Sequence, residues 1–122
     1  MEFVKMGSQK RREAVDSELR LSRQAYANGL TGAAFGHLER AHVLSQPRTW
    51  LHVRTHLAML VWAWRQNDRR ELLGQLIRIP AALVFSRIWV PLGNTGGAKV
   101  NARLPMEIPE DLSALLRSFG RD

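Results

Sequence analysis

The sequence predicts an all-α fold made of two antiparallel helical hairpins, an ordered glycine-rich loop and a short C-terminal helix. Apolar residues recur every three or four positions through most of the first 85 residues, which is the spacing of one face of an α-helix. Glycine, asparagine or proline interrupts this spacing at short intervals. Short connections favour antiparallel neighbours. No segment alternates apolar and polar residues as a half-buried strand does.

The first hairpin is predicted from its turn residues. Residues 1–9 are expected to form a loose arm, followed by a helix over residues 10–28. Gly29 ends this helix, because glycine readily adopts the left-handed conformation of a helix C-cap. The second helix, over residues 32–44, begins after Thr31, whose hydroxyl group is a good N-cap.

The second hairpin completes a helical region that we expect over residues 10–88. Its first helix begins at Pro47, because the missing N–H of proline costs nothing in the first turn. Asp68 caps the next helix, and Pro80 is expected to kink or end it. The apolar spacing of the two helices predicts that they bury Trp50 and Trp64 on the first, and Leu72, Leu73, Leu76 and Ile77 on the second.

The remainder of the chain has a different character. Residues 89–108 form a predicted loop region, in which Gly93–Gly97 is rich in turn-forming residues. Residues 109–119 form a predicted C-terminal helix with acidic residues in its first turn, where the helix dipole favours them. The length of 122 residues suggests one domain, spanning residues 1–122.

The charge of the chain bears on its partners. The formal net charge is +7, and between Arg20 and Arg103 twelve basic residues outnumber three acidic ones. Such a surplus attracts nucleic acid or anionic lipid. A solvated basic surface accounts for the same charge, so the support for nucleic acid is weak. Protein partners or self-association remain the expected interactions.

The cysteine count and the hydropathy of the chain limit its class. The sequence has no cysteine, so disulfides and thiolate ligands are excluded. Its longest apolar run, residues 57–64, is far shorter than the roughly 20 residues that span a bilayer. The N-terminus has no signal-peptide pattern. We therefore expect a cytoplasmic protein without a membrane span.

All four histidines lie close together in the sequence. His52 and His56 are four residues apart, on one face of the predicted third helix. His42 lies before the turn between the second and third helices, and it is about as far from that turn as His52, which lies after it. This pattern predicts a metal site of His42, His52 and His56, with His37 or Glu39 as a further ligand. Imidazole and carboxylate ligands suit a divalent ion such as zinc. Two alternatives are histidines that hydrogen-bond and fill space between helices, and a pH-responsive patch.

The helical hairpins resemble tetratricopeptide repeats. Large, small and turn residues follow the order typical of such a repeat in the first hairpin, at Leu21, Ala25, Gly29, Ala34, Leu38, Ala41 and Pro47. The second hairpin offers a looser copy, at Met59, Leu60, Ala63, Asn67, Leu72, Leu76 and Ile79. The two turns are 38 residues apart, against about 34 in that family. The resemblance implies paired helices.

Most of the chain also resembles a bacterial family known as domain of unknown function 3703. Four segments carry this resemblance: His37-Leu38-Glu39-Arg40-Ala41-His42-Val43-Leu44, His52-x-x-x-His56-x-x-Met59-Leu60, Glu71-x-x-Gly74-Gln75 and Pro91-x-Gly93-Asn94-Thr95-Gly96-Gly97. They lie within residues 15–100. The family has no established activity. Because its members neighbour genes that handle heavy metals, the resemblance implies a link to metal stress.

Two functions follow from these observations. The first is a small non-enzymatic interaction module that acts through its helical surface or by self-association. The alternative is a divalent-metal-binding protein that uses the histidine cluster of the second and third helices, linked to metal stress. An enzyme that uses such a metal ranks third, since no Ser-His-Asp arrangement is evident and no catalytic residue is predicted.

Overall fold

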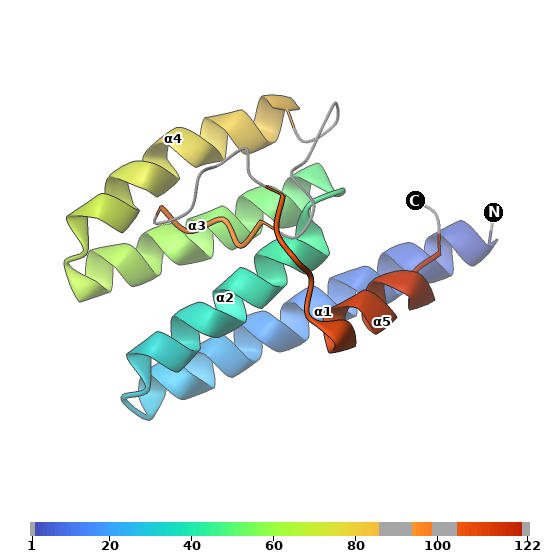
Figure 1. The fold of residues 1–122 in the computed structure, drawn as a ribbon, viewed down its shortest axis with the longest axis horizontal. Coiled ribbons are helices and arrows are strands. Elements are labelled where there is room, and N and C mark those ends of the chain that lie inside the picture. The colour runs from blue at the N-terminus through green and yellow to red at the C-terminus, as the bar shows by residue number, and fades with distance from the viewer. Residues whose placement is uncertain (1, 86–93, 99–104, 121–122) are drawn as a thin grey trace.

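All regular structure is α-helical in the part of the chain that the computed structural model describes, which is residues 2–85, 94–98 and 105–120 (Figure 1). This confirms the predicted all-α class. The helices are α1 (Glu2–Ala27), α2 (Thr31–Ser45), α3 (Thr49–Gln66), α4 (Arg69–Phe85) and α5 (Glu110–Ser118). Residues 86–93 and 99–104, which hold most of the predicted loop region, lie outside the described residues.

Tight turns join the first four helices into two hairpins. Helix α1 packs along α2, α3 packs along α4, and α2 joins the two pairs by packing on α3. After α1 the chain turns at Gly29, whose φ is +77°, and Leu30 donates a backbone hydrogen bond to Ala25. After α3 it turns at Asn67, a left-handed C-cap with φ of +55°. The predicted hairpins are therefore confirmed, whereas their likeness to tetratricopeptide repeats stays a prediction.

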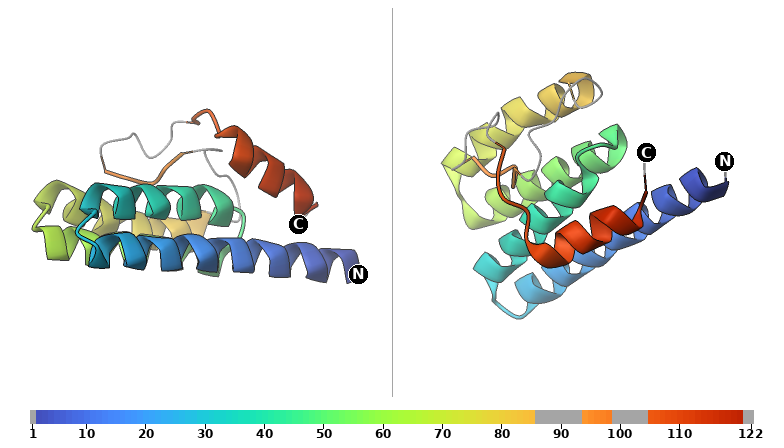
Figure 2. Two further views of the ribbon diagram at one scale, coloured as in Figure 1. Left: turned by 90° about the horizontal axis from the view of Figure 1, so that it is seen from below. Right: turned by 45° about the vertical axis from the view of Figure 1, so that its right-hand side comes forward.

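Helix α5 completes the hydrophobic core. It runs beside the N-terminal half of α1 and over α2, as the views in Figure 2 show. Leu112 and Phe119 are almost fully buried, and the Arg11 guanidinium lies 4.9 Å from the centre of the Phe119 ring. The core cluster contains residues of α1, α2, α3 and α5 and the residue that follows α5. Its members are Val15, Leu19, Leu38, Ala41, Val43, Leu44, Met59, Leu112 and Phe119.

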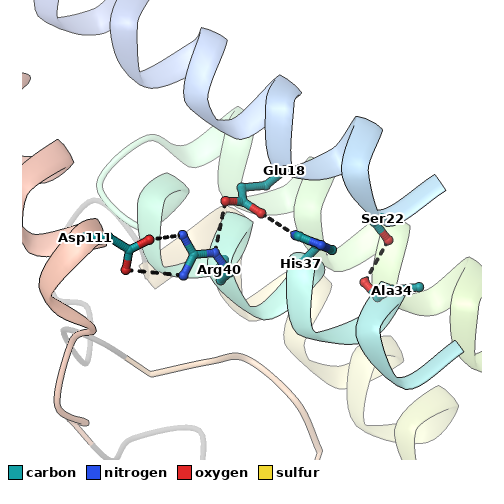
Figure 3. Close-up of polar contacts among 6 residues, drawn as sticks. All are labelled: Glu18, Ser22, Ala34, His37, Arg40 and Asp111. Atoms are coloured by element: carbon teal, nitrogen blue, oxygen red, sulfur yellow. Dashed lines mark hydrogen bonds and ion pairs between the residues drawn. The ribbon is translucent and has the colours of Figure 1, made fainter. Parts of the chain in front are cut away.

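A polar network fastens α1, α2 and α5 together (Figure 3). Glu18 of α1 accepts a hydrogen bond from Nδ1 of His37 at 2.7 Å and another from Nε of Arg40 at 3.0 Å. Arg40 also forms an ion pair with Asp111 of α5. On the other side of His37, the Ser22 hydroxyl donates to the carbonyl oxygen of Ala34 at 2.8 Å. His37 thus serves the packing of α1 on α2.

The N-terminal residues differ from the prediction. The loose arm expected over residues 1–9 is wrong, because α1 begins at Glu2 and is continuous to Ala27. The reason lies in the contact with the C-terminal segment. A Cβ atom on Gly7 would overlap the carbonyl oxygen of Phe119, so the backbone of α1 at Gly7 packs directly on the C-terminal segment. The sequence of residues 1–9 does not reveal this long-range contact.

Helix α4 departs from part of the prediction at Pro80 and from the predicted buried side. It continues through Pro80 to Phe85, so Pro80 does not end it, and the kink expected as the other outcome stays a prediction. Pro80 and Leu76, whose carbonyl oxygen loses the helical hydrogen bond, both lie on the exposed side, where water can replace that bond. The predicted buried side is also wrong, since Leu73, Leu76 and Ile77 are 52–73% exposed and only Leu72 is half-buried.

The burial of the aromatic residues of α3 also differs from the prediction. Trp50 and Trp64, predicted to be core residues, are 73% and 74% exposed. Trp62 is half-buried instead, 4.5 Å from the Phe35 ring, and its indole N–H donates to the Thr31 carbonyl oxygen. Within the described residues, no helix combines the length and the hydropathy needed to cross a bilayer. The cytoplasmic location stays a prediction.

Candidate metal centre

Three of the four histidines meet between α2 and α3. The Nε2 atom of His42 lies 2.9 Å from that of His52 and 3.1 Å from that of His56, and the last two atoms are 3.2 Å apart. The nitrogens thus form a nearly equilateral triangle. All three side chains are buried, with 3–7% of their surface exposed. We call His42, His52 and His56 the histidine triad.

Local helix geometry brings the triad together. His52 and His56 stand one turn apart on the buried side of α3, and His42 belongs to the last turn of α2. Beside them, the hydroxyl groups of Ser45 and Thr55 lie 3.2 Å apart and join the same two helices. The α2–α3 turn therefore fixes the height at which the imidazoles face one another.

Two outer hydrogen bonds decide where the protons of the triad lie. Nδ1 of His42 lies 2.6 Å from the carbonyl oxygen of Asn94, and Nδ1 of His56 lies 2.5 Å from Oε1 of Gln75. Both partners are acceptors, so each Nδ1 carries the proton. The orientation of the Gln75 amide is fixed in turn, because its Nε2 donates to Glu71 and to the Gly96 carbonyl oxygen. A neutral imidazole has one N–H, so both Nε2 atoms carry a lone pair.

Two lone pairs therefore point at each other across 3.1 Å, from His42 and His56. His52 can donate its single N–H to one of these nitrogens, but no proton remains for the contact between the other two. Such a contact between acceptors is unfavourable in a buried site. A cation bound by all three lone pairs removes the conflict. Outer acceptors that hold Nδ1–H are also the usual support of histidine ligands.

Burial keeps the triad uncharged at neutral pH. It lowers the pKa of His52 to about 3 and that of His56 to about 4. The pKa of His42 is also well below its usual range, first because of burial and then because of the neighbouring imidazoles. The charge of Arg78 lowers the pKa of both His42 and His56 further. A metal ion consequently meets three neutral imidazoles at pH 7 and does not have to displace a proton from an imidazolium.

His37 and Glu39 do not join the triad. His37, which was predicted as a further ligand, is held by Glu18 instead. Among the described residues, only His42, His52 and His56 form a group of histidine, cysteine or acidic side chains close enough to hold one ion. The core of the predicted site is thus brought together, and its two peripheral members are not.

Comparison with known proteins adds a family. Residues 9–116 match the family described as "Protein of unknown function (DUF3703)". The chain belongs to this family. A search of curated proteins and a search of solved structures each found no match. The family description assigns no activity to its members.

A short loop covers the triad of this DUF3703 protein. The Asn94 side chain accepts a hydrogen bond from the Gly96 N–H at 2.9 Å, and the Ala98 N–H donates to Glu71 at 2.8 Å. Gly96 has a φ of +82°, and a Cβ atom there would lie 2.7 Å from Nε2 of His42. Glycine is thus required at this position, both for its backbone conformation and for its approach to the ring.

Sequence reasoning missed the residues that support the triad. Glu71 and Gln75 are 4% and 0% exposed, and Asn94 is 1% exposed, although all three are polar. Their only signal in the sequence was membership of two segments that carry the resemblance to the family. These buried polar groups explain why α4 turns its polar side inward, since an imidazole and a backbone carbonyl in the interior need hydrogen-bond partners.

Proposed function

We propose that this DUF3703 protein binds one divalent transition-metal ion, such as zinc, through His42, His52 and His56. The observation that carries the proposal is the pair of lone pairs that face each other on His42 and His56, 3.1 Å apart. Nitrogen atoms at these separations can all reach one ion with bonds of about 2.0–2.1 Å. The link to metal stress that the family resemblance implies would use the same site.

The competing interpretation is a cluster of histidines that only fill space between α2 and α3. A stable cluster of neutral imidazoles needs one proton in each nitrogen–nitrogen contact. Asn94 and Gln75 hold the protons of His42 and His56 on the opposite ring nitrogens. This arrangement leaves the Nε2 atoms of His42 and His56 free to bind a metal ion. Without an ion, the same two atoms face each other in an unfavourable contact, so we favour the metal site.

A zinc titration in competition with a chromophoric chelator tests this function. We expect one zinc ion per native chain and none for His52→Ala. This variant keeps the outer hydrogen bonds of His42 and His56, because Nδ1 of His52 has no partner among the described residues. His37→Ala is the matched control and should bind one ion, since His37 pairs with Glu18. Circular dichroism checks that each variant is folded.

The titration separates the two interpretations. Zinc binding by His52→Ala that equals binding by the native chain would contradict the metal site. Loss of zinc in the folded His37→Ala variant would contradict the proposed ligand set. Sub-stoichiometric binding that none of the substitutions changes would also exclude the proposal.

A second candidate function is self-association through the outer sides of α3 and α4. Large apolar side chains are exposed there, and no helix of the described residues covers them; a contiguous exposed apolar patch marks an interaction surface. They are Trp50, Leu57, Val61, Trp64, Leu73, Leu76, Ile77, Leu83 and Val84. These residues support the interaction module that the sequence predicts, and such a surface is compatible with a metal site on the inner side.

Sedimentation equilibrium tests the second candidate. Ile77 is 73% exposed, so Ile77→Arg should leave the monomer folded and add a charge to the surface. We expect a native protein that is dimeric or larger at micromolar concentration and a variant that is monomeric. A native protein that stays monomeric throughout the concentration range would exclude self-association.

A further inference from the structure

The triangle of ligand nitrogens is too small to surround a metal ion. With nitrogen–nitrogen distances of 2.9–3.2 Å and bonds of about 2.0–2.1 Å, a bound ion lies about 1 Å outside the plane of the three nitrogens. The histidines then occupy one side of the ion only. No fourth histidine or acidic side chain joins the group among the described residues. The histidine and acidic side chains of the described residues therefore leave at least one coordination position of the ion unfilled.

Charge favours an anion at the open position. The three ligands are neutral, so a divalent ion keeps its full charge in a site whose side chains are at most 7% exposed. A buried charge without a counter-charge is costly. Glu71, the acidic residue of the supporting network, already accepts hydrogen bonds from Gln75 and from the Ala98 N–H. It is an outer partner of the site and contributes no ligand atom to the group.

A second cation lies beside the site. Nη1 of Arg78 donates to the Gly96 carbonyl oxygen at 3.0 Å, and the charge of Arg78 depresses the pKa of both His42 and His56. The backbone at Gly96 packs directly against His42, because a Cβ atom there would come within 2.7 Å of the ligand nitrogen. A metal ion at the triad would add positive charge next to Arg78, and an anion in this region would offset both.

We infer that the metal-loaded triad takes a small monovalent inorganic anion as its fourth ligand, and that Arg78 strengthens the binding of this anion. The inference rests on the proposed metal site. The step is a ligand exchange: a lone pair of the anion forms a bond to the metal, a water molecule leaves, and no electron is transferred. Arg78 acts on the anion through its charge and makes no bond to the metal.

The cobalt(II)-loaded protein tests this inference, because the visible absorption of cobalt(II) reports its coordination. We expect one cobalt ion per native chain and a saturable spectral change when azide is added. Arg78→Met should retain the cobalt ion but raise the dissociation constant of azide at least fivefold. Arg70→Met is the matched control, since Arg70 is an exposed arginine of the same helix, and its dissociation constant for azide should be unchanged.

The outcomes of the two proposals are distinguishable. Failure to bind one cobalt ion in a histidine-dependent way would overturn the metal site itself. Stoichiometric cobalt with a spectrum that azide does not change would overturn only the anion site, and this titration of the native protein decides even if Arg78→Met does not fold. Equal azide dissociation constants for native protein and folded Arg78→Met would overturn the role of Arg78.

Discussion

Replacing Gln75 with leucine is expected to reduce the free energy of unfolding by about 2–6 kcal/mol, since two buried polar groups lose their partner and each costs about 1–3 kcal/mol. The Gln75 side chain is fully buried. It accepts a hydrogen bond from His56 and donates to Glu71 and to the Gly96 carbonyl oxygen. Leucine fills a similar volume but leaves the Nδ1–H of His56 and Oε1 of Glu71 without this partner. The Gly96 carbonyl oxygen keeps its hydrogen bond from Arg78.

The same substitution should weaken zinc binding. Removal of an outer partner of a histidine ligand typically costs 10–100-fold in metal affinity, and Gln75→Leu frees Nδ1 of His56 from its acceptor. Urea denaturation with chelator and zinc titration measure the two effects. Gln66→Leu is the matched control, because Gln66 is half-buried and donates to the Tyr26 hydroxyl. A destabilisation of Gln75→Leu no larger than that of Gln66→Leu would contradict the buried network.

The metal-free protein should lose stability as the pH falls from 6.5 to 5. In the folded chain the pKa of His52 is about 3 and that of His56 about 4, whereas in the unfolded chain both are near 6.5. Between these values the unfolded state binds more protons, so acid favours unfolding. Well above pH 6.5 these histidines are neutral in both states and impose no penalty, and the loss of stability that has accumulated at pH 5 is on the order of 4 kcal/mol.

Urea midpoints in the presence of chelator at pH 7, 6 and 5 measure this dependence. The His52→Gln variant should show a shallower dependence, because glutamine does not titrate and His52 contributes a large share of the effect. A midpoint that does not change between pH 7 and pH 5 would show that the triad is not buried in its neutral form. Parallel curves for the native protein and His52→Gln would exclude His52 as a source of the effect.

The helices of this protein could be predicted from periodicity, but their orientation could not. Leucines at helical spacing identify α4 equally well whether they face the core or the solvent. The inner side of α4 holds Glu71 and Gln75 because its neighbours are imidazoles and loop carbonyls, which need hydrogen-bond partners. That requirement depends on contacts such as the one from His42 to Asn94, 52 positions apart in the chain.

The centre of the site could be predicted because its geometry is local. His52 and His56 share a helix face, and one short turn brings His42 opposite them. The supporting residues come from α4 and from the loop at Gly96, and their positions depend on tertiary contacts. The N-terminal part of α1 depends on a tertiary contact in the same way, because the residues expected to form an arm are helical where the C-terminal segment packs on them.

X-ray absorption spectroscopy of the zinc-loaded protein tests the central claim most directly, because it counts the ligands of the bound ion. We predict three imidazole nitrogens at about 2.0–2.1 Å and at least one further light atom. His52→Ala should bind no zinc, and His37→Ala should reproduce the native spectrum. A native spectrum without imidazole scattering, or one that His52→Ala leaves unchanged, would contradict a metal site at the histidine triad.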